Sequence, residues 1–190
     1  MIYNNKYEVK EFLGNGGFGA VFKVLNKIDN NYYALKFIKN SENIEIKTFK
    51  KDNEKIINII NDLKNKYIIE LKDNFYDEIN KGYCIVMGLC DGNLRNILNK
   101  YKPNGLPLNI INKIFIQIND ALKAMIKKGY TYRDLKPENI LIKYTDQYNI
   151  NFDIKLSDFG LSTYDINSSL HNFSTNDSLN YMAPEIETLN

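Results

Sequence analysis

Cysteine and histidine are scarce in this chain of 190 residues, which holds two cysteines and one histidine. Cys84 and Cys90 are too few for a disulfide framework, and no cluster of His and Cys indicates a zinc site. No apolar run approaches the length of a membrane span, and the N-terminus lacks the apolar core of a signal peptide. We therefore expect a soluble intracellular protein, placed in the reducing cytoplasm, without a membrane partner.

Excess charge of one sign is also lacking, because the formal net charge is +2. No strong electrostatic field therefore points to nucleic acid as a partner. Hydrophobic residues make up 44% of the chain. This share is enough for one domain or for two small lobes.

Apolar residues alternate along the first half of the chain, which is typical of strands. The alternation predicts strands at residues 7–16, 19–26, 32–38, 67–77 and 82–89. Between about residues 41 and 65 the period becomes helical, with an apolar stripe of Phe49, Ile56, Ile59, Ile60 and Leu63.

The second half is predicted to be rich in helices. We expect a short helix at residues 91–101 and a long amphipathic helix at residues 109–129, where Gly129 is a normal C-terminal signal. Two short strands at 139–144 and 152–157 follow, and the remaining residues read mostly as loop. The change of composition places a hinge near Gly88 to Gly92.

A glycine-rich turn lies between the first two predicted strands. Gly14, Gly16 and Gly19 have the G-x-G-x-x-G spacing, in which glycines let the backbone approach phosphates closely. A dinucleotide fold would need a helix directly after the glycines, and a Walker loop would need Lys and Ser or Thr where this chain has Ala20 and Val21. Of the phosphate-binding glycine motifs, a turn between two strands that covers the phosphates as a flap is the one left. The alternative is an ordinary glycine-rich hairpin.

The next predicted strand carries Ala34 and Lys36, which share one face because they are two residues apart. If that face lies beneath the glycine turn, Ala34 leaves room for a flat ring and Lys36 meets phosphate oxygens. The alternative for Lys36 is an ordinary solvated lysine on a strand.

A polar run, "YRDLKPEN", stands between the long helix and an apolar "ILI". Asp134 can orient a hydroxyl nucleophile or accept its proton, and Lys136 can neutralise charge on a transferring phosphoryl group. Asn139 and Asp158 supply the oxygen ligands that Mg²⁺ prefers. Each residue taken singly also fits a tight turn, since Pro137 and Asn139 favour turns.

Together these motifs resemble those of the eukaryotic-type protein kinases, in Ser/Thr form. "GNGGFGAV" matches the Gly-rich loop, "YALK" the strand lysine motif, "YRDLKPEN" the catalytic loop, and "DFG" and "APE" the two ends of the activation segment. The resemblance implies an α+β, two-lobed protein-kinase-like fold. Residues 1–88 would form a β-rich N-lobe with one helix, and residues 89–190 a partial helical C-lobe.

The resemblance also implies an ATP- and Mg²⁺-dependent serine/threonine kinase acting on protein substrates. Asp134, Lys136 and Asn139 would be catalytic, with Asn139 and Asp158 holding the metal. The residues implied to bind the nucleotide are Leu13, Gly14, Asn15, Gly16, Gly17, Phe18, Gly19, Ala20, Val21, Ala34, Lys36, Glu54, Met87, Leu89 and Leu141.

Substrate class and regulation follow from the same likeness. Lys136 within "KPEN" is similar to Ser/Thr kinases, and "DSLNYMAPE" resembles their peptide-docking segment with Ser178 in place of Thr. Arg133, directly before Asp134, implies that a phosphorylated loop residue organises the site, because Arg pairs well with phosphate. The candidate phosphosites, which are equally consistent with plain solvated residues, are Ser168, Ser169, Ser174 and Thr175.

Two departures from the family pattern concern single residues. Tyr132 replaces the usual His, whose ring packs under the Phe of DFG, here Phe159, and an aromatic side chain can fill the same space. The helix Glu that should pair with Lys36 is the second departure. The apolar phase assigns its position to Ile56 or, one turn earlier, to Asn53, whereas Glu54 is the nearest acid and would need a different helix phase. We predict Glu54.

The third departure is that the chain stops five residues after Glu185, where family domains continue into several helices. We expect the apolar face of the long helix to lose cover, and a completing or regulatory protein partner to be involved. The alternative functions are a catalytically weak or inactive kinase-derived module that binds a nucleotide or a partner, and a small-molecule kinase on a related fold.

Overall fold

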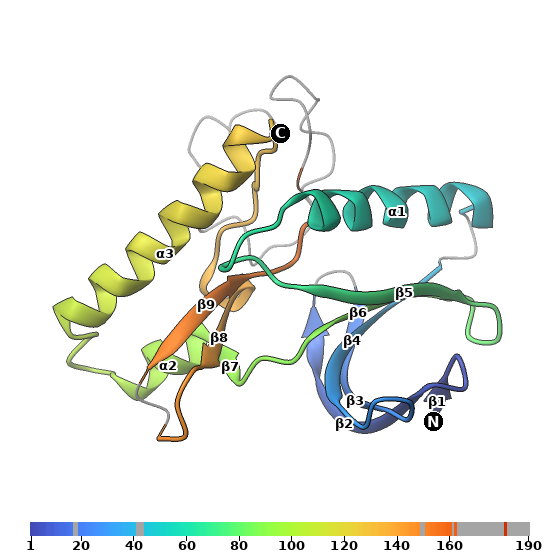
Figure 1. The fold of residues 1–190 in the computed structure, drawn as a ribbon, viewed down its shortest axis with the longest axis horizontal. Coiled ribbons are helices and arrows are strands. Elements are labelled where there is room, and N and C mark those ends of the chain that lie inside the picture. Colours follow the sequence, from blue (N-terminus) through green and yellow to red (C-terminus); the bar gives the residue numbers. More distant parts are fainter. Residues whose placement is uncertain (17–18, 41–43, 149–150, 161, 163–180, 182–190) are drawn as a thin grey trace. The chain divides into compact units, whose positions relative to one another are not determined.

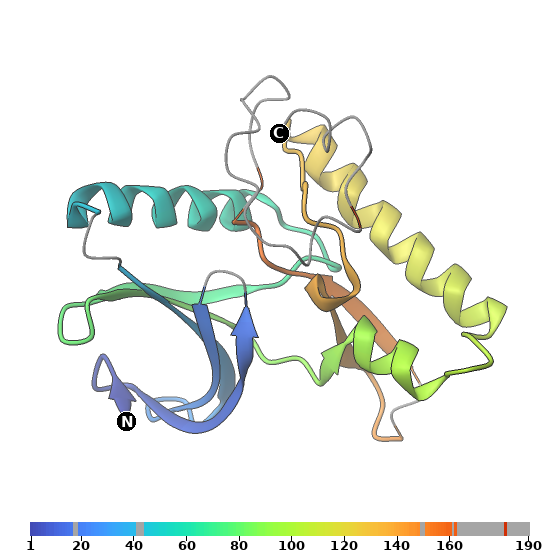
Figure 2. The same cartoon turned by 180° about the vertical axis from the view of Figure 1, so that it is seen from behind.

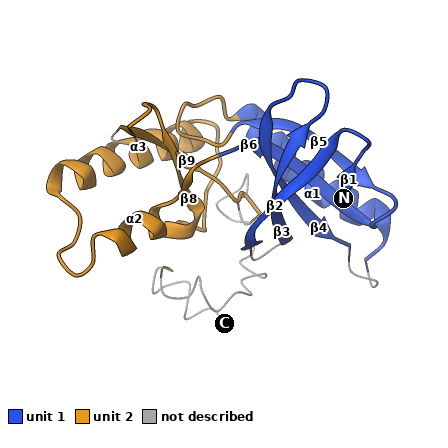
Figure 3. Ribbon diagram, turned by 90° about the horizontal axis from the view of Figure 1, so that it is seen from below, with its two compact units in different colours: residues 1–62, 70–89 blue, residues 63–69, 90–190 orange. Residues whose placement is uncertain are grey.

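The computed structural model describes residues 1–16, 19–40, 44–148, 151–160, 162 and 181. It contains two compact units, coloured separately in Figure 3. Unit 1 comprises residues 1–62 and 70–89, and unit 2 comprises residues 63–69 and 90–190.

Unit 1 is a six-stranded antiparallel sheet with one helix (Figure 1). Its elements are β1 (Ile2–Tyr3), β2 (Tyr7–Gly16), β3 (Gly19–Asn26), β4 (Tyr32–Lys39), α1 (Ile46–Asp62), β5 (Leu71–Asp77) and β6 (Gly82–Gly88). The strand order is β1-β2-β3-β4-β6-β5. The predicted strands at 7–16, 19–26 and 32–38 are therefore confirmed, and the unpredicted β1 is too short to show a sequence period.

The two faces of this sheet bury different sets of residues, as the alternation of side chains requires. One face packs the cluster of Tyr3, Tyr7, Val24, Leu35, Cys84 and Val86. The other face packs against α1, in a cluster of Phe49, Ile57, Tyr83 and Ile85. Lys36 is flanked on β4 by Leu35 and Phe37 of the first face. It therefore belongs to the second face, the one that α1 covers.

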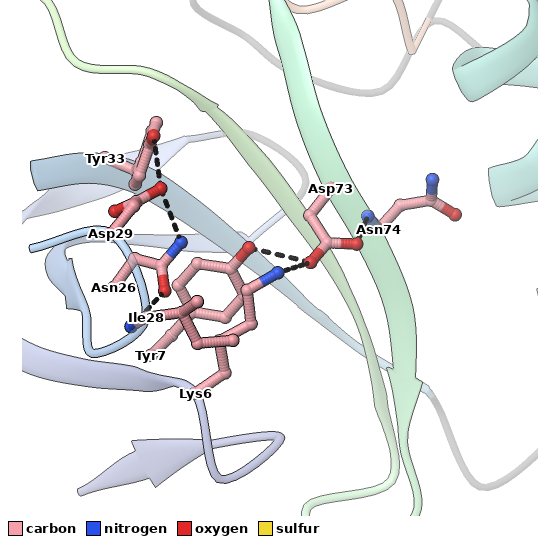
Figure 4. Close-up of polar contacts among 8 residues, drawn as sticks. All are labelled: Lys6, Tyr7, Asn26, Ile28, Asp29, Tyr33, Asp73 and Asn74. Atoms are coloured by element: carbon pink, nitrogen blue, oxygen red, sulfur yellow. Dashed lines mark hydrogen bonds and ion pairs between the residues drawn. The ribbon is translucent and has the colours of Figure 1, made fainter. Parts of the chain in front are cut away.

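A polar clasp joins two strands of unit 1 that are not neighbours in the sheet, β2 and β5 (Figure 4). Asp73 Oδ2 accepts hydrogen bonds from Lys6 Nζ at 2.8 Å and from Tyr7 OH at 2.7 Å. The ring of Tyr7 also stacks on Phe75, with centroids 6.0 Å apart. These contacts hold the sheet curled, because they span it from one side to the other. We call Lys6, Tyr7 and Asp73 the sheet clasp.

Unit 2 contains a small three-stranded sheet and the long helix α3 (Figure 2). Its elements are β7 (Gly92–Asn93), α2 (Leu94–Lys100), α3 (Leu108–Lys127), the 3-10 helix η1 (Pro137–Asn139), β8 (Ile140–Tyr144) and β9 (Phe152–Leu156). Asn93 caps α2, since its side chain accepts from Asn96 N and Asn96 Oδ1 accepts from Asn93 N. α3 is fixed to β9 by Gln117, whose Oε1 accepts from Ile154 N at 2.8 Å.

One predicted strand begins later than its apolar pattern indicates. We expected a strand over 67–77, but β5 begins at Leu71. Residues 67–69 belong to unit 2, where Ile69 N donates to Leu156 O and Leu156 N donates to Tyr67 O. Backbone pairing with β9 therefore takes the first part of the apolar run away from β5.

Among the described residues, the long helix α3 has apolar side chains that are buried and others that are exposed. Ile114, Gln117, Ala121 and Met125 are buried at helical spacing. Exposed apolar side chains on the same helix are Leu108, Ile111, Phe115, Ile116 and Ile126. The expectation that this helix loses cover because the chain stops after Glu185 stays a prediction. Across the part of the chain that the structure describes, no helix is both long and apolar enough to cross a membrane.

Candidate active site

The polar run after α3 folds into a small buried cluster around Asp134. Asn139 Nδ2 donates to Asp134 Oδ2 at 2.7 Å and to the Asp134 carbonyl at 2.9 Å. Lys136 Nζ lies 3.3 Å from the same Oδ2. The Asp134 and Asn139 residues are only 4% and 6% exposed, so these bonds fix the direction of the carboxylate. We call Asp134, Lys136 and Asn139 the loop cluster.

The backbone around the loop cluster is fixed from both sides. Pro137 begins η1, and Asn139 N donates back to Lys136 O at 3.0 Å. Ile140 and Ile142 are buried in β8 and anchor the run, as the apolar "ILI" predicted. Ser157, which the sequence did not single out, donates both its N–H and its hydroxyl to Asn139 O at 3.0 Å. The feature of the sequence that could have pointed to Ser157 is its position directly before "DFG".

Tyr132 packs on Phe159 as predicted, with ring centroids 5.5 Å apart and planes at 69°. Its hydroxyl donates to Ser157 O, and Ser162 Oγ donates to Tyr132 O at 3.1 Å. Burial raises the pKa of Tyr132 well above its usual value, and the negative charges of Asp158 and Asp134 raise it further. The phenol therefore stays protonated and keeps its hydrogen bond at neutral pH.

Asp158 follows the segment that is tied to Asn139, and its backbone has φ 60°, in the left-handed region. Arg133, beside Asp134, has φ 66°. Such conformations are uncommon for residues other than Gly and cluster at functional sites. The hydrogen bonds that the N–H and the hydroxyl of Ser157 donate to Asn139 O bring the chain segments of Asp158 and Asn139 together within unit 2.

The donor set fits the divalent ion that the resemblance implies. Asn139 donates both hydrogens of its amide nitrogen to Asp134, so its amide oxygen is directed away from that residue. Asp158 offers a charged oxygen from the adjoining segment. A neutral and a charged oxygen together are ligands that Mg²⁺ accepts while it keeps phosphates in its shell.

In unit 1, two glycines of the predicted flap are required for different reasons. Gly14 has φ +151° and open space where a Cβ would stand, so its need is conformational. At Gly19, which has φ +154°, a Cβ would lie 2.2 Å from Phe37 O, so no side chain fits against β4. The hairpin of β2 and β3 thus reaches as far as the Gly16–Gly19 pair while it stays packed on β4.

Strand register places four predicted nucleotide residues of unit 1 on one face of the sheet. Val21 pairs with Lys36, and Ala34 pairs with Met87. Directly paired residues point to the same face, and Ala34 and Lys36 are two apart. Lys36 is 8% exposed, which differs from an ordinary solvated lysine.

The helix facing Lys36 carries no buried acid among its described residues. Asn53 is 5% exposed and donates from Nδ2 to Phe49 O at 2.9 Å, whereas Glu54 is exposed. The buried face of α1 thus has the phase in which Asn53, not Glu54, faces the sheet. The pairing of Glu54 with Lys36 stays a prediction.

The remaining predicted residues are distributed as follows. Leu13, Asn15, Gly16 and Ala20 lie in the β2–β3 hairpin, and Leu89 follows β6. Leu141 lies on β8 of unit 2. Gly17 and Phe18, the four candidate phosphosites, Ser178 and the "APE" residues 183–185 lie outside the described residues.

Comparison with known proteins agrees with this geometry. The family described as "Protein kinase domain" matches residues 7–188. The probable serine/threonine-protein kinase yakA of Dictyostelium discoideum is 34% identical over 95% of this chain and 12% of its own length. The dual specificity tyrosine-phosphorylation-regulated kinase 2 of Drosophila melanogaster is 32% identical over 84% of this chain and 21% of its own.

A similar relation holds with the homeodomain-interacting protein kinase 1 of Caenorhabditis elegans, which is 31% identical over 97% of this chain. The chain spans 21% of that protein, and so covers a minor part of each of these relatives. The family match nevertheless extends over nearly all of the chain. The chain therefore belongs to the protein kinase domain family.

Proposed function

We propose that this chain transfers the γ-phosphoryl group of ATP to Ser or Thr hydroxyls of protein substrates. The observation that carries the proposal is the loop cluster. In this cluster the amide of Asn139 and the ammonium group of Lys136 hold the buried carboxylate of Asp134. The carboxylate is therefore oriented to receive a substrate hydroxyl from one direction. The proposal also draws on the family and on relatives whose names include serine/threonine-protein kinase.

Asp134 is the proposed catalytic residue that receives the substrate hydroxyl. Its carboxylate orients the hydroxyl and accepts its proton as the O–P bond forms. Lys136 stabilises the charge that spreads over the transferring phosphoryl oxygens. Asn139 keeps the Asp134 carboxylate in position through its two hydrogen bonds.

The nucleotide is proposed to bind along the unit 1 face that carries Lys36. Lys36 meets phosphate oxygens, and backbone N–H groups of the Gly14–Gly19 turn line the phosphates. Ala34, Val21 and Met87 contact the adenine ring, because register puts them on the same face as Lys36. Leu141 of unit 2 and the hinge residue Leu89 complete this proposed set, together with Leu13, Asn15, Gly16, Gly17, Phe18 and Ala20.

Mg²⁺ is the proposed metal, held by the oxygens of Asn139 and Asp158. When bound, the ion neutralises phosphate charge and so favours the departure of the ADP oxygen. Protein substrates are the proposed partners. The regulatory roles of Arg133 and of a completing protein partner stay predictions.

The test is transfer of labelled phosphate from ATP to peptides that differ only in one acceptor: Ser, Thr, Tyr or Ala. The Tyr peptide is included because one relative is named as a dual specificity kinase. We expect transfer to Ser and Thr in the presence of Mg²⁺, and a fall of about 10²-fold to 10⁴-fold in Asp134→Asn. If wild type and Asp134→Asn are equally inert while both are folded and bind ATP, the chain is a binding module and not a kinase.

A further inference from the structure

Arg95 in the first turn of α2 joins two segments that are distant in the sequence. Its Nε donates to Glu138 Oε1 at 2.7 Å, and its Nη2 donates to the hydroxyl of Tyr181. Glu138 lies in η1, within the polar run that holds the loop cluster. Tyr181 directly precedes "MAPE". One guanidinium group therefore connects the catalytic loop with the segment that the sequence predicts to dock peptides.

The geometry of these contacts restricts how Arg95 can move. Nε and Nη2 lie on one edge of the planar guanidinium, so its two acceptors must stand side by side along that edge. The bond to Glu138 is charge-assisted on both partners, and such bonds are stronger than those between neutral groups. Displacement of Tyr181 would therefore break one contact while the other still holds Arg95 to the loop.

The charges agree with a persistent contact. Burial by itself raises the pKa of Glu138, but the hydrogen bond from Arg95, a backbone hydrogen bond and the charges of Arg95 and Lys136 together lower the pKa below its usual value. The bonds to Glu138 and Tyr181 raise the pKa of Arg95. Both partners are ionised across the neutral range. All three residues are partly exposed: the side chains of Arg95 and Glu138 by 36% and 43%, and Tyr181 by 46%.

We propose that Arg95 is a positioning residue for the protein substrate, because it joins Tyr181 to Glu138 of the Asp134 loop. This inference rests on the proposed kinase function. It assigns Arg95 no contact with ATP. Loss of Arg95 therefore weakens peptide binding while nucleotide binding and the chemical step remain.

The experiment compares wild type with Arg95→Ala, Arg95→Lys, Tyr181→Phe and the double variant Arg95→Ala/Tyr181→Phe. Lys100→Ala is the control, since it removes one positive charge from the exposed end of the same helix. Initial rates are measured against peptide at saturating ATP, and against ATP at saturating peptide. Solvent screens a partly exposed ion pair, so the expected effect on peptide binding is a few-fold.

We expect Arg95→Ala to raise the KM for peptide about fivefold, with kcat and the KM for ATP within about twofold of wild type. Arg95→Lys should recover part of the effect. The double variant should be no worse than Arg95→Ala, because Arg95→Ala already removes the contact that Tyr181→Phe removes. Additive effects, or a rise in the KM for ATP instead, would overturn the proposal. Lys100→Ala should match wild type.

A second measurement keeps this inference separate from the proposed activity. Hydrogen–deuterium exchange of the peptide that contains Tyr181 reports its opening without any phosphoryl transfer. We expect at least about fivefold faster exchange in Arg95→Ala than in Lys100→Ala. Equal exchange in these two variants refutes the positioning role even if the wild type is an active kinase. An inert wild type with the expected exchange difference refutes the kinase proposal alone.

Discussion

The loop cluster of unit 2 and the sheet clasp of unit 1 use the same chemistry for different ends. In each, one carboxylate oxygen accepts from a lysine and from a second donor: Asp134 Oδ2 in the loop cluster and Asp73 Oδ2 in the clasp. Residue type and bond pattern therefore do not distinguish the two clusters. They differ in the sequence separation of their members and in the burial of their carboxylates.

The loop cluster draws all its members from six consecutive positions, whereas the clasp joins residues 66 and 67 positions apart. Asp134 has a side chain that is 4% exposed, against 29% for Asp73. A compact loop can hold charged groups away from water for chemistry because the local backbone orders them. The sheet clasp instead holds together two strands that are not neighbours in the sheet.

The largest effect is expected where a charge is added to the loop cluster, in Asn139→Asp. The change keeps an oxygen but loses both hydrogen bonds to Asp134 and sets two buried carboxylates against each other. We expect phosphoryl transfer to fall about 100-fold or more and the free energy of unfolding to fall by about 3 kcal/mol. Rate assays and urea titration measure the two effects. A variant with normal stability and normal rate would show that the cluster has no role in either.

Asp73→Asn tests the opposite expectation for the clasp. It removes the charge that Lys6 and Tyr7 contact, so we expect a loss of about 1–2 kcal/mol in the free energy of unfolding. Transfer activity per folded molecule should remain within about twofold, since Asp73 touches no proposed catalytic residue. A strong loss of rate in fully folded protein would mean that the two clusters are not separate in function.

The different separations also explain what the sequence could and could not predict. The loop cluster was predicted because Asp134, Lys136 and Asn139 stand together in one run. The clasp, and the bond between Arg95 and Glu138, were not, because they join residues 43 or more positions apart. Strand register could not be predicted either, and it is register that adds Val21 and Met87 to the face that Ala34 and Lys36 share.

Where local pattern competed with a distant partner, the local reading was wrong in detail. The strand expected from residue 67 begins at Leu71 because β9 pairs with the residues before it. The expected apolar stripe of α1 included Ile56, whereas the buried set contains Asn53 and Ile57. Apolar runs in which several neighbours are isoleucine leave the phase of a helix open, and packing decides it.

A third and smaller effect concerns alkaline pH. Burial, followed by the bond to Asp73, raises the pKa of Tyr7 from 10.0 to about 12. The folded state therefore favours the protonated phenol, so this contribution to stability is complete below pH 10.0 and is lost as pH rises to about 12. We expect Tyr7→Phe to cost about 1 kcal/mol at neutral pH and to lose less stability than wild type over that alkaline window.

The control for this prediction is Tyr148→Phe, which alters a tyrosine that is 73% exposed. Denaturant midpoints at neutral pH and across the alkaline window should be those of wild type in this variant. If Tyr7→Phe and Tyr148→Phe respond alike, the clasp does not contribute through its phenol. The remaining stabilisation would then come from Lys6 and Asp73 alone.

The smallest effect, on the KM for ATP, is expected for Glu54→Gln. This variant tests whether Lys36 of unit 1 has an acidic partner, as Lys136 of unit 2 has. The sequence predicted that Glu54 pairs with Lys36, as Lys136 pairs with Asp134 in the loop cluster. Yet Glu54 is exposed on α1, and exposed ion pairs contribute at most about 1 kcal/mol. We expect the KM for ATP to change less than about threefold, while Asn53→Ala, on the sheet-facing side, changes it more. If Glu54→Gln raises the KM tenfold and Asn53→Ala does not, α1 turns its acid toward the sheet when nucleotide binds, and the predicted pair is restored.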